Sequence, residues 1–114
     1  MDLDIQIIRT KSPKEKPQSE ANLSFGKLFT DHMFLVEYTE GRGWHDARIQ
    51  PYGPLAIDPA SPVLHYSQEI FEGLKVYRRK DGGLQMFRPL ENANRMNRSA
   101  DRMCMPQLDP EFQV

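Results

Sequence analysis

Aromatic and β-branched residues gather in two pairs of short segments, and a glycine-bearing turn separates the members of each pair. Residues 33–38 (MFLVEY) and 44–49 (WHDARI) flank the turn 40–43 (EGRG). Residues 74–77 and 84–87 alternate apolar and polar side chains around the turn 80–83 (KDGG). Asp-Gly and Gly-Gly steps tolerate the left-handed dihedrals of hairpin turns. The pattern therefore predicts two β-hairpins.

The spacing of apolar residues changes to a helical period after the second hairpin. Pro89 suits the first position of a helix, and Pro106 ends the pattern. The residues that fall on one face are Leu90, Ala93, Met96, Ala100, Met103 and Cys104. The spacing predicts a helix over residues 89–104, with Arg95, Arg98 and Arg102 on another face. A further helix is predicted near the end of the sequence, where Asp109, Pro110 and Glu111 are residues typical of a helix start.

The remaining segments are short or rich in proline. Ile5–Ile8 can pair as an edge strand, and residues 11–20 are charged and carry two prolines, which is typical of a solvated tether. Four prolines between positions 51 and 62 leave room for one short strand around Leu55–Ile57. We expect a strand and tether over residues 1–23 and a small domain over 24–114. The fold class is α+β, with a mixed, mainly antiparallel sheet packed on one main helix (about 89–104).

Composition narrows the classes of function. The chain has 114 residues, enough for one domain, and a net charge of −1, which argues against attraction to nucleic acid or anionic lipid. No apolar run approaches the ~20 residues that span a bilayer, and there is no secretory signal, so the cytoplasm is expected. Cys104 is the one cysteine, and His32, His45 and His65 lack metal-site spacing, so we expect no disulfide and no metal site.

Four residues are candidates for binding a ligand. The planar guanidinium of Arg95 can hold a phosphate through two parallel hydrogen bonds, or it belongs to a wet helix face with Arg98 and Arg102. Tyr66 and Phe71 can wall an apolar pocket, or they pack in an ordinary core. Gly73 can let a ligand approach the backbone, or it marks a β-bulge. On chemistry alone, these residues do not specify a reaction.

Three blocks of sequence closely resemble the branched-chain amino acid aminotransferases, enzymes of the fold-type IV pyridoxal-phosphate group. They are 24–38 (SFGKLFTDHMFLVEY), 48–78 (RIQPYGPLAIDPASPVLHYSQEIFEGLKVYR) and 84–106 (LQMFRPLENANRMNRSADRMCMP). The HY-x₄-FEG-x-K motif is shared with related members of the group. FGKLFTDHM and FRP-x₅-RM-x₂-SA are more particular to the branched-chain enzymes.

The resemblance implies transfer of the amino group of leucine, isoleucine or valine to 2-oxoglutarate through pyridoxal phosphate. Arg95 resembles the arginine that binds the cofactor phosphate. Phe25, Tyr66 and Phe71 resemble walls of the substrate pocket, and Gly73 resembles the glycine beside it. Full-length relatives are homodimers.

The resemblance also implies that the catalytic residues lie elsewhere. The Schiff-base lysine of the family belongs to a large domain that follows this region. We therefore expect the chain to be a piece of a longer protein, without a catalytic residue of its own and inactive in isolation. Two alternatives stay open. One is a related fold-type IV enzyme, a D-amino acid aminotransferase or an aminodeoxychorismate lyase, and the other is a non-catalytic self-association module.

Overall fold

The computed structural model describes residues 1–19, 21 and 23–114. The chain forms two compact units, which are considered separately. Leu3–Ala56 is called the strand unit, and Met1–Asp2 together with Ile57–Val114 is called the helical unit. The class is α+β: two small, mostly antiparallel sheets and three short helices, which confirms the predicted class. The strands divide between two separate sheets and do not form the single sheet expected.

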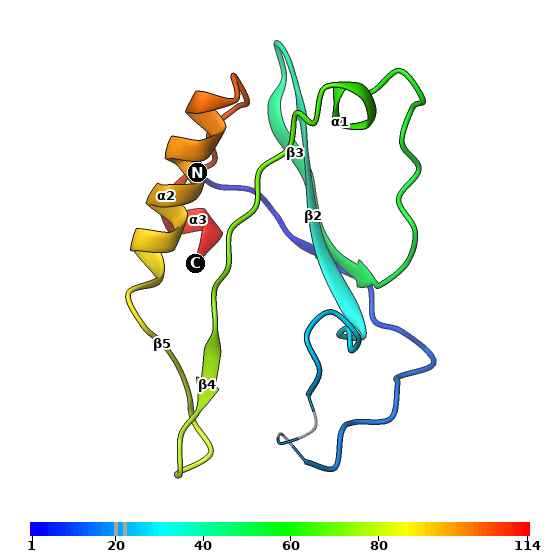
Figure 1. Ribbon diagram of the computed structural model, residues 1–114, viewed down its shortest axis with the longest axis vertical. Coiled ribbons are helices and arrows are strands. Elements are labelled where there is room, and N and C mark those ends of the chain that lie inside the picture. The colour runs from blue at the N-terminus through cyan, green and yellow to red at the C-terminus, as the bar shows by residue number, and fades with distance from the viewer. Residues whose placement is uncertain (20, 22) are drawn as a thin grey trace. The chain divides into compact units, whose positions relative to one another are not determined.

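The strand unit holds the first predicted hairpin, which is confirmed. β2 (His32–Thr39) and β3 (Gly43–Pro51) pair antiparallel and run side by side in Figure 1. β1 (Gln6–Ile7), within the predicted edge strand, pairs in parallel with β3, so the strand order is β1-β3-β2. At the turn, Gly41 has a φ of 83°, a left-handed conformation that a residue without a Cβ adopts at little cost.

The helical unit begins with α1 (Pro62–His65) and continues into the second predicted hairpin. β4 (Val76–Arg78) pairs antiparallel with β5 (Leu84–Met86). The short strand expected around Leu55–Ile57 is not there: residues 52–58 have irregular backbone, and the one-turn α1 follows. Pro54, next to Leu55, has no N–H to donate to a ladder, which disfavours a strand here.

The predicted main helix is α2 (Pro89–Arg102), and α3 (Pro110–Gln113) follows it. α2 ends two residues before the predicted limit because Cys104 takes a left-handed φ of 54°. The Cys104 N–H donates to the Asp101 carbonyl (3.1 Å), and the Met105 N–H donates to the Ala100 carbonyl (2.8 Å). These two bonds form a Schellman motif. α3 starts as predicted, with the Asp109 side chain accepting from the Glu111 N–H (3.0 Å).

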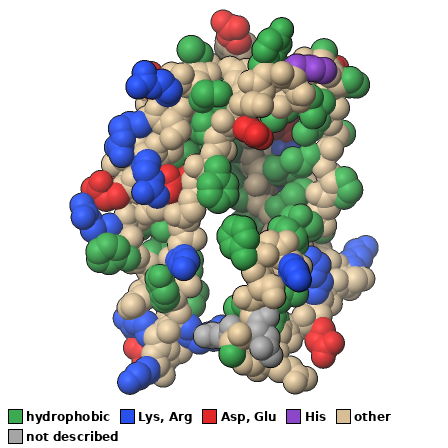
Figure 2. All heavy atoms as spheres, in the orientation of Figure 1, with side chains coloured by type: hydrophobic (Ala, Val, Ile, Leu, Met, Phe, Trp, Pro, Cys, Tyr) green, Lys and Arg blue, Asp and Glu red, His purple; other side chains and the backbone are tan. Residues whose placement is uncertain are grey.

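Little of the apolar surface is buried. Among the described residues, the buried ones are Ala47 and His45 in the strand unit and Ala93 and Ala100 on α2. Large hydrophobic side chains reach the surface across the face drawn in Figure 2. The described residues therefore form secondary structure without a large core of their own.

Candidate functional site

The best-defined polar cluster joins Glu72 to Arg95. Glu72 lies in the loop before β4, and Arg95 lies in the middle of α2. The Arg95 Nε–H donates to Glu72 Oε2 (2.7 Å), and Arg95 Nη2 donates to Glu72 Oε1. This two-pronged geometry matches the planar guanidinium to the planar carboxylate, and charge-assisted bonds of this kind are the strong ones.

Two further groups hold Glu72 in place. Its Oε1 accepts from the Gly73 N–H (3.0 Å) and from Asn92 Nδ2 (3.1 Å), and Asn92 Nδ2 also donates to the Gly73 carbonyl (2.8 Å). The Glu72 side chain is 11% exposed, whereas the Arg95 side chain is 59% exposed. The carboxylate is thus the fixed partner, and the guanidinium reaches out from it toward solvent.

The electrostatics follow from these contacts. The hydrogen bonds from Arg95 lower the pKa of Glu72 from 4.5 to about 2, with smaller contributions from Asn92 and the Gly73 N–H. The same contact with Glu72 raises the pKa of Arg95. Glu72 is therefore a carboxylate, and Arg95 a cation, throughout the neutral range.

Arg95 borders an open hollow of about 560 Å³ on the helical unit. The residues that line it are Glu69, Ile70, Phe71, Arg95, Arg98, Ser99, Arg102 and Met103. The side chains of Arg98 and Arg102 have no hydrogen bond or ion pair with any described residue, so their charges are not neutralised locally. Basic side chains follow α2 in Figure 2. Three guanidinium groups around one hollow suit a compact anion such as a phosphate group.

The sequence-predicted site residues are partly brought together. Phe71 and Arg95 line the same hollow, and the ring of Phe71 is 87% exposed. Gly73 lies beside Glu72 and is fixed through its carbonyl by Asn92. Tyr66 is 84% exposed and is not among the lining residues of the hollow. Phe25 belongs to the strand unit, where its ring is fully exposed.

Sequence reasoning missed the roles of Glu72 and Asn92. In the sequence, Glu72 stands out only as part of the FEG motif, and 23 residues separate it from Arg95. No periodicity links a loop residue to a helix residue at that distance. A signal does exist within α2, since Asn92 and Arg95 are three residues apart and so share a helix face.

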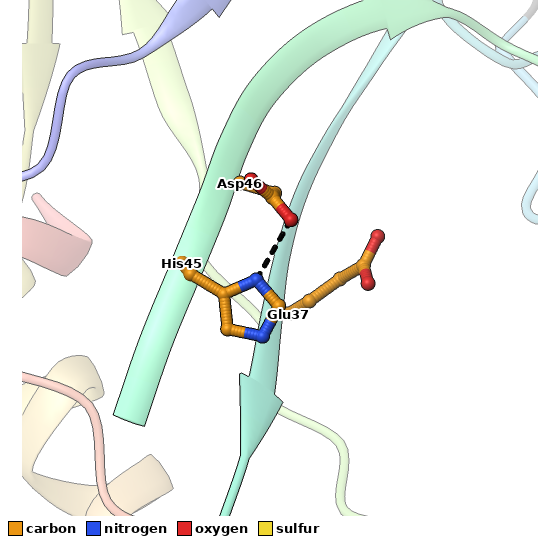
Figure 3. A group of neighbouring side chains, drawn as sticks. All are labelled: Glu37, His45 and Asp46. Atoms are coloured by element: carbon orange, nitrogen blue, oxygen red, sulfur yellow. Dashed lines mark hydrogen bonds and ion pairs between the residues drawn. The ribbon is translucent and has the colours of Figure 1, made fainter. Parts of the chain in front are cut away.

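A second cluster, in the strand unit, brings together three potential metal ligands. One ligand atom each from Glu37 of β2 and His45 and Asp46 of β3 lies within 4.8 Å of the others (Figure 3). Nδ1 of His45 bonds Asp46 Oδ2 (2.8 Å), and Nε2 bonds the Thr39 hydroxyl (2.9 Å). Glu37 pairs with Arg48 (2.8 Å). These bonds within the sheet already engage both ring nitrogens, so we read the cluster as an ion-pair network.

Among the described residues, no helix is long and apolar enough to cross a membrane. A scan against protein-family models found no match. Individual known proteins, in contrast, match closely.

The chain is 56% identical over 108 residues to branched-chain-amino-acid transaminase 1 of Bacillus subtilis. This match covers 95% of the chain. By sequence, the chain matches a part of the branched-chain aminotransferases. The cytosolic branched-chain aminotransferase of Saccharomyces cerevisiae is 48% identical over 91% of the chain, and the mitochondrial one of Mus musculus is 48% identical over 95%. The chain spans about 30% of the length of these aminotransferases.

Proposed function

We propose that this chain is the substrate-side, N-terminal portion of an enzyme that moves the amino group of leucine, isoleucine or valine to 2-oxoglutarate. The observation that carries the proposal is the 56% identity to a branched-chain transaminase over 95% of the chain. We extend it to pyridoxal phosphate as cofactor, a fold-type IV homodimer and a cytoplasmic address. In the whole protein, residues 24–114 would form the small domain.

The residues of the hollow fit a phosphorylated cofactor. A phosphate dianion needs hydrogen-bond donors and positive charge, and Arg95, Arg98 and Arg102 supply both at one hollow. Arg95 is the residue proposed to bind the cofactor phosphate. Pyridoxal phosphate, when bound, supplies the electron sink for transamination. The chain's own contribution is to bind and orient the phosphate end.

The substrate-side wall is assigned to Phe25, Tyr66, Phe71 and Gly73. All three rings are strongly exposed, so they are available to contact a ligand or another part of the protein. An aromatic wall favours branched aliphatic side chains over polar ones, although each methylene discriminates by only about 1–3 kcal/mol. Selectivity would thus come from several rings together.

No residue of this chain is proposed as catalytic. The lysine that would carry the cofactor is assigned to a part of the protein outside these 114 residues. The isolated chain is therefore expected to be inactive toward leucine.

A substrate panel on the whole protein tests this function. We expect transamination of leucine, isoleucine and valine with 2-oxoglutarate, and no transamination by the isolated chain. Borohydride treatment of the isolated chain with pyridoxal phosphate should trap no specific lysine adduct, as judged by peptide mass spectrometry. Activity on D-alanine without activity on leucine would show a D-amino acid aminotransferase instead.

A further inference from the structure

We propose that Glu72 is a positioning residue that directs the guanidinium of Arg95 into the hollow on the helical unit and so creates its anion site. The inference rests on the proposed function in one respect, because it takes Arg95 to be the phosphate-binding residue. It adds a residue to which no binding role has been assigned above.

Glu72 uses only part of the hydrogen-bonding capacity of Arg95. A guanidinium carries five N–H groups. Glu72 accepts from the Nε–H and from one N–H of Nη2, which lie along one edge of the planar group. The other three N–H groups, one on Nη2 and two on Nη1, make no hydrogen bond with any described residue. Their edge is free to hold a second anion by two parallel bonds.

Glu72 constrains the orientation of Arg95, and not the reverse. Glu72 is nearly buried and is anchored by the Gly73 N–H and by Asn92, whereas Arg95 is more than half exposed. A long, exposed arginine otherwise samples many rotamers, which a ligand would have to freeze on binding. Because the guanidinium is planar, holding one edge also sets the direction of the opposite edge.

The opposite interpretation is that Glu72 competes with a bound anion for Arg95. Its negative charge lies beside the site and, by Coulomb's law alone, would weaken the attraction for an anion. A simple removal of Glu72 therefore mixes two effects of opposite sign. Glu69 allows them to be separated, because it lines the hollow and its carboxylate forms no ion pair with any described residue.

The experiment compares Glu72→Gln with Glu69→Gln in the full 114-residue chain. Glu69→Gln removes one negative charge from the hollow and Glu72→Gln removes one beside it, but only Glu72→Gln releases Arg95. Inorganic phosphate is titrated by calorimetry, and the Arg95 Nε–H signal is followed by ¹⁵N NMR. We expect Glu72→Gln to bind phosphate about two- to tenfold more weakly than Glu69→Gln, the range that freezing one long side chain implies. The Arg95 Nε–H signal should broaden or exchange faster in Glu72→Gln alone.

Two controls separate the possible failures. Glu72→Asp retains the charge but shortens the reach to Arg95, so under the positioning role it should bind phosphate more weakly than wild type. Phosphate binding by Glu72→Gln that equals or exceeds binding by Glu69→Gln would overturn the positioning role. Arg95→Gln tests the underlying site: if it binds phosphate as wild type does, the proposed function of Arg95 is wrong. If it loses binding while Glu72→Gln matches Glu69→Gln, only the role of Glu72 is wrong.

Discussion

At the scale of single residues, the Glu72–Arg95 pair is the clearest result. The sequence makes Arg95 a candidate because a guanidinium can bind phosphate. The orientation of its side chain, however, depends on the groups that lie next to it. The structure supplies a carboxylate held by Asn92 and the Gly73 N–H. A predicted binding residue thus acquires a defined orientation from a loop far away in the sequence.

The titration of Glu72 tests this pair directly. Its pKa in the folded chain is about 2, against an ordinary value of 4.5, because Arg95 stabilises the carboxylate. The folded state therefore binds its proton less readily than the unfolded state does. The pair contributes stability fully above about pH 4.5, and this contribution is lost as the pH falls from 4.5 toward 2.

We expect a ¹³C NMR titration of the Glu72 carboxyl to show a midpoint near 2, the pKa in the folded chain. In Arg95→Ala the midpoint should rise toward 4.5, because the largest cause of the shift is gone. Arg98→Ala is the matched control: it removes an arginine from the same hollow without touching Glu72. Equal midpoints in wild type and Arg95→Ala would contradict the pairing.

At the scale of elements, α2 shows why helix ends are harder to predict than helices. The apolar spacing and Pro89 predicted the helix and its first residue. The end differs because a non-glycine residue, Cys104, adopts the left-handed conformation that usually signals glycine. The Schellman hydrogen bonds of Cys104 and Met105 then stop α2 at Arg102.

The join between α2 and α3 depends on one side chain of α2. Asn97 Oδ1 accepts from the Leu108 N–H (3.0 Å), and Asn97 Nδ2 donates to the Leu108 carbonyl (2.7 Å). Gln113 of α3 also donates to Asn97 Oδ1 (3.3 Å). Apolar spacing treats Asn97 as one more polar position, so the sequence pattern contained no sign of this clamp.

Replacing this clamp should loosen the chain after α2. We expect Asn97→Ala to lower the free energy of opening at Leu108 by about 1–3 kcal/mol, because the Leu108 N–H loses its partner and the Leu108 carbonyl keeps only Gln113 Nε2 (2.8 Å). The measurement is amide hydrogen exchange at Leu108. Asn94→Ala is the control, since Asn94 is exposed on the same helix and bonds no described side chain or backbone group. The two variants change helix propensity equally, so similar exchange rates would rule out the clamp.

At the scale of the whole molecule, the balance between buried and exposed apolar surface stands out. Three alanines and one histidine are the buried residues among those described, whereas most of the large aromatic and aliphatic side chains are exposed. Hydrophobic stabilisation scales with the apolar area removed from water. Small side chains such as alanine contribute little to it.

We therefore expect a small unfolding enthalpy for the isolated chain. Globular proteins average about 0.7 kcal/mol per residue near ~60 °C, which is about 80 kcal/mol for 114 residues. Differential scanning calorimetry should give clearly less, with a broad transition and strong binding of a hydrophobic dye before heating. A single sharp transition near the average enthalpy would show that more apolar surface is buried than the structure indicates.

The sequence by itself determined the local elements of this protein and its likeness to the branched-chain aminotransferases. Glycine turns between β-rich segments specify hairpins, and apolar spacing after Pro89 specifies a helix, because both depend on neighbouring residues. Unbroken blocks of sequence show the likeness to the aminotransferases, because a match of consecutive residues needs no knowledge of contacts in space.

Only the tertiary structure decided which elements share a sheet and which groups meet Arg95. It divided the hairpins between two sheets and left the segment around Leu55–Ile57 without a strand. It also placed Glu72 against Arg95 and brought Phe71 to the same hollow. These outcomes join residues that are distant in the chain, and the side-chain contacts that decide them leave no period in the sequence.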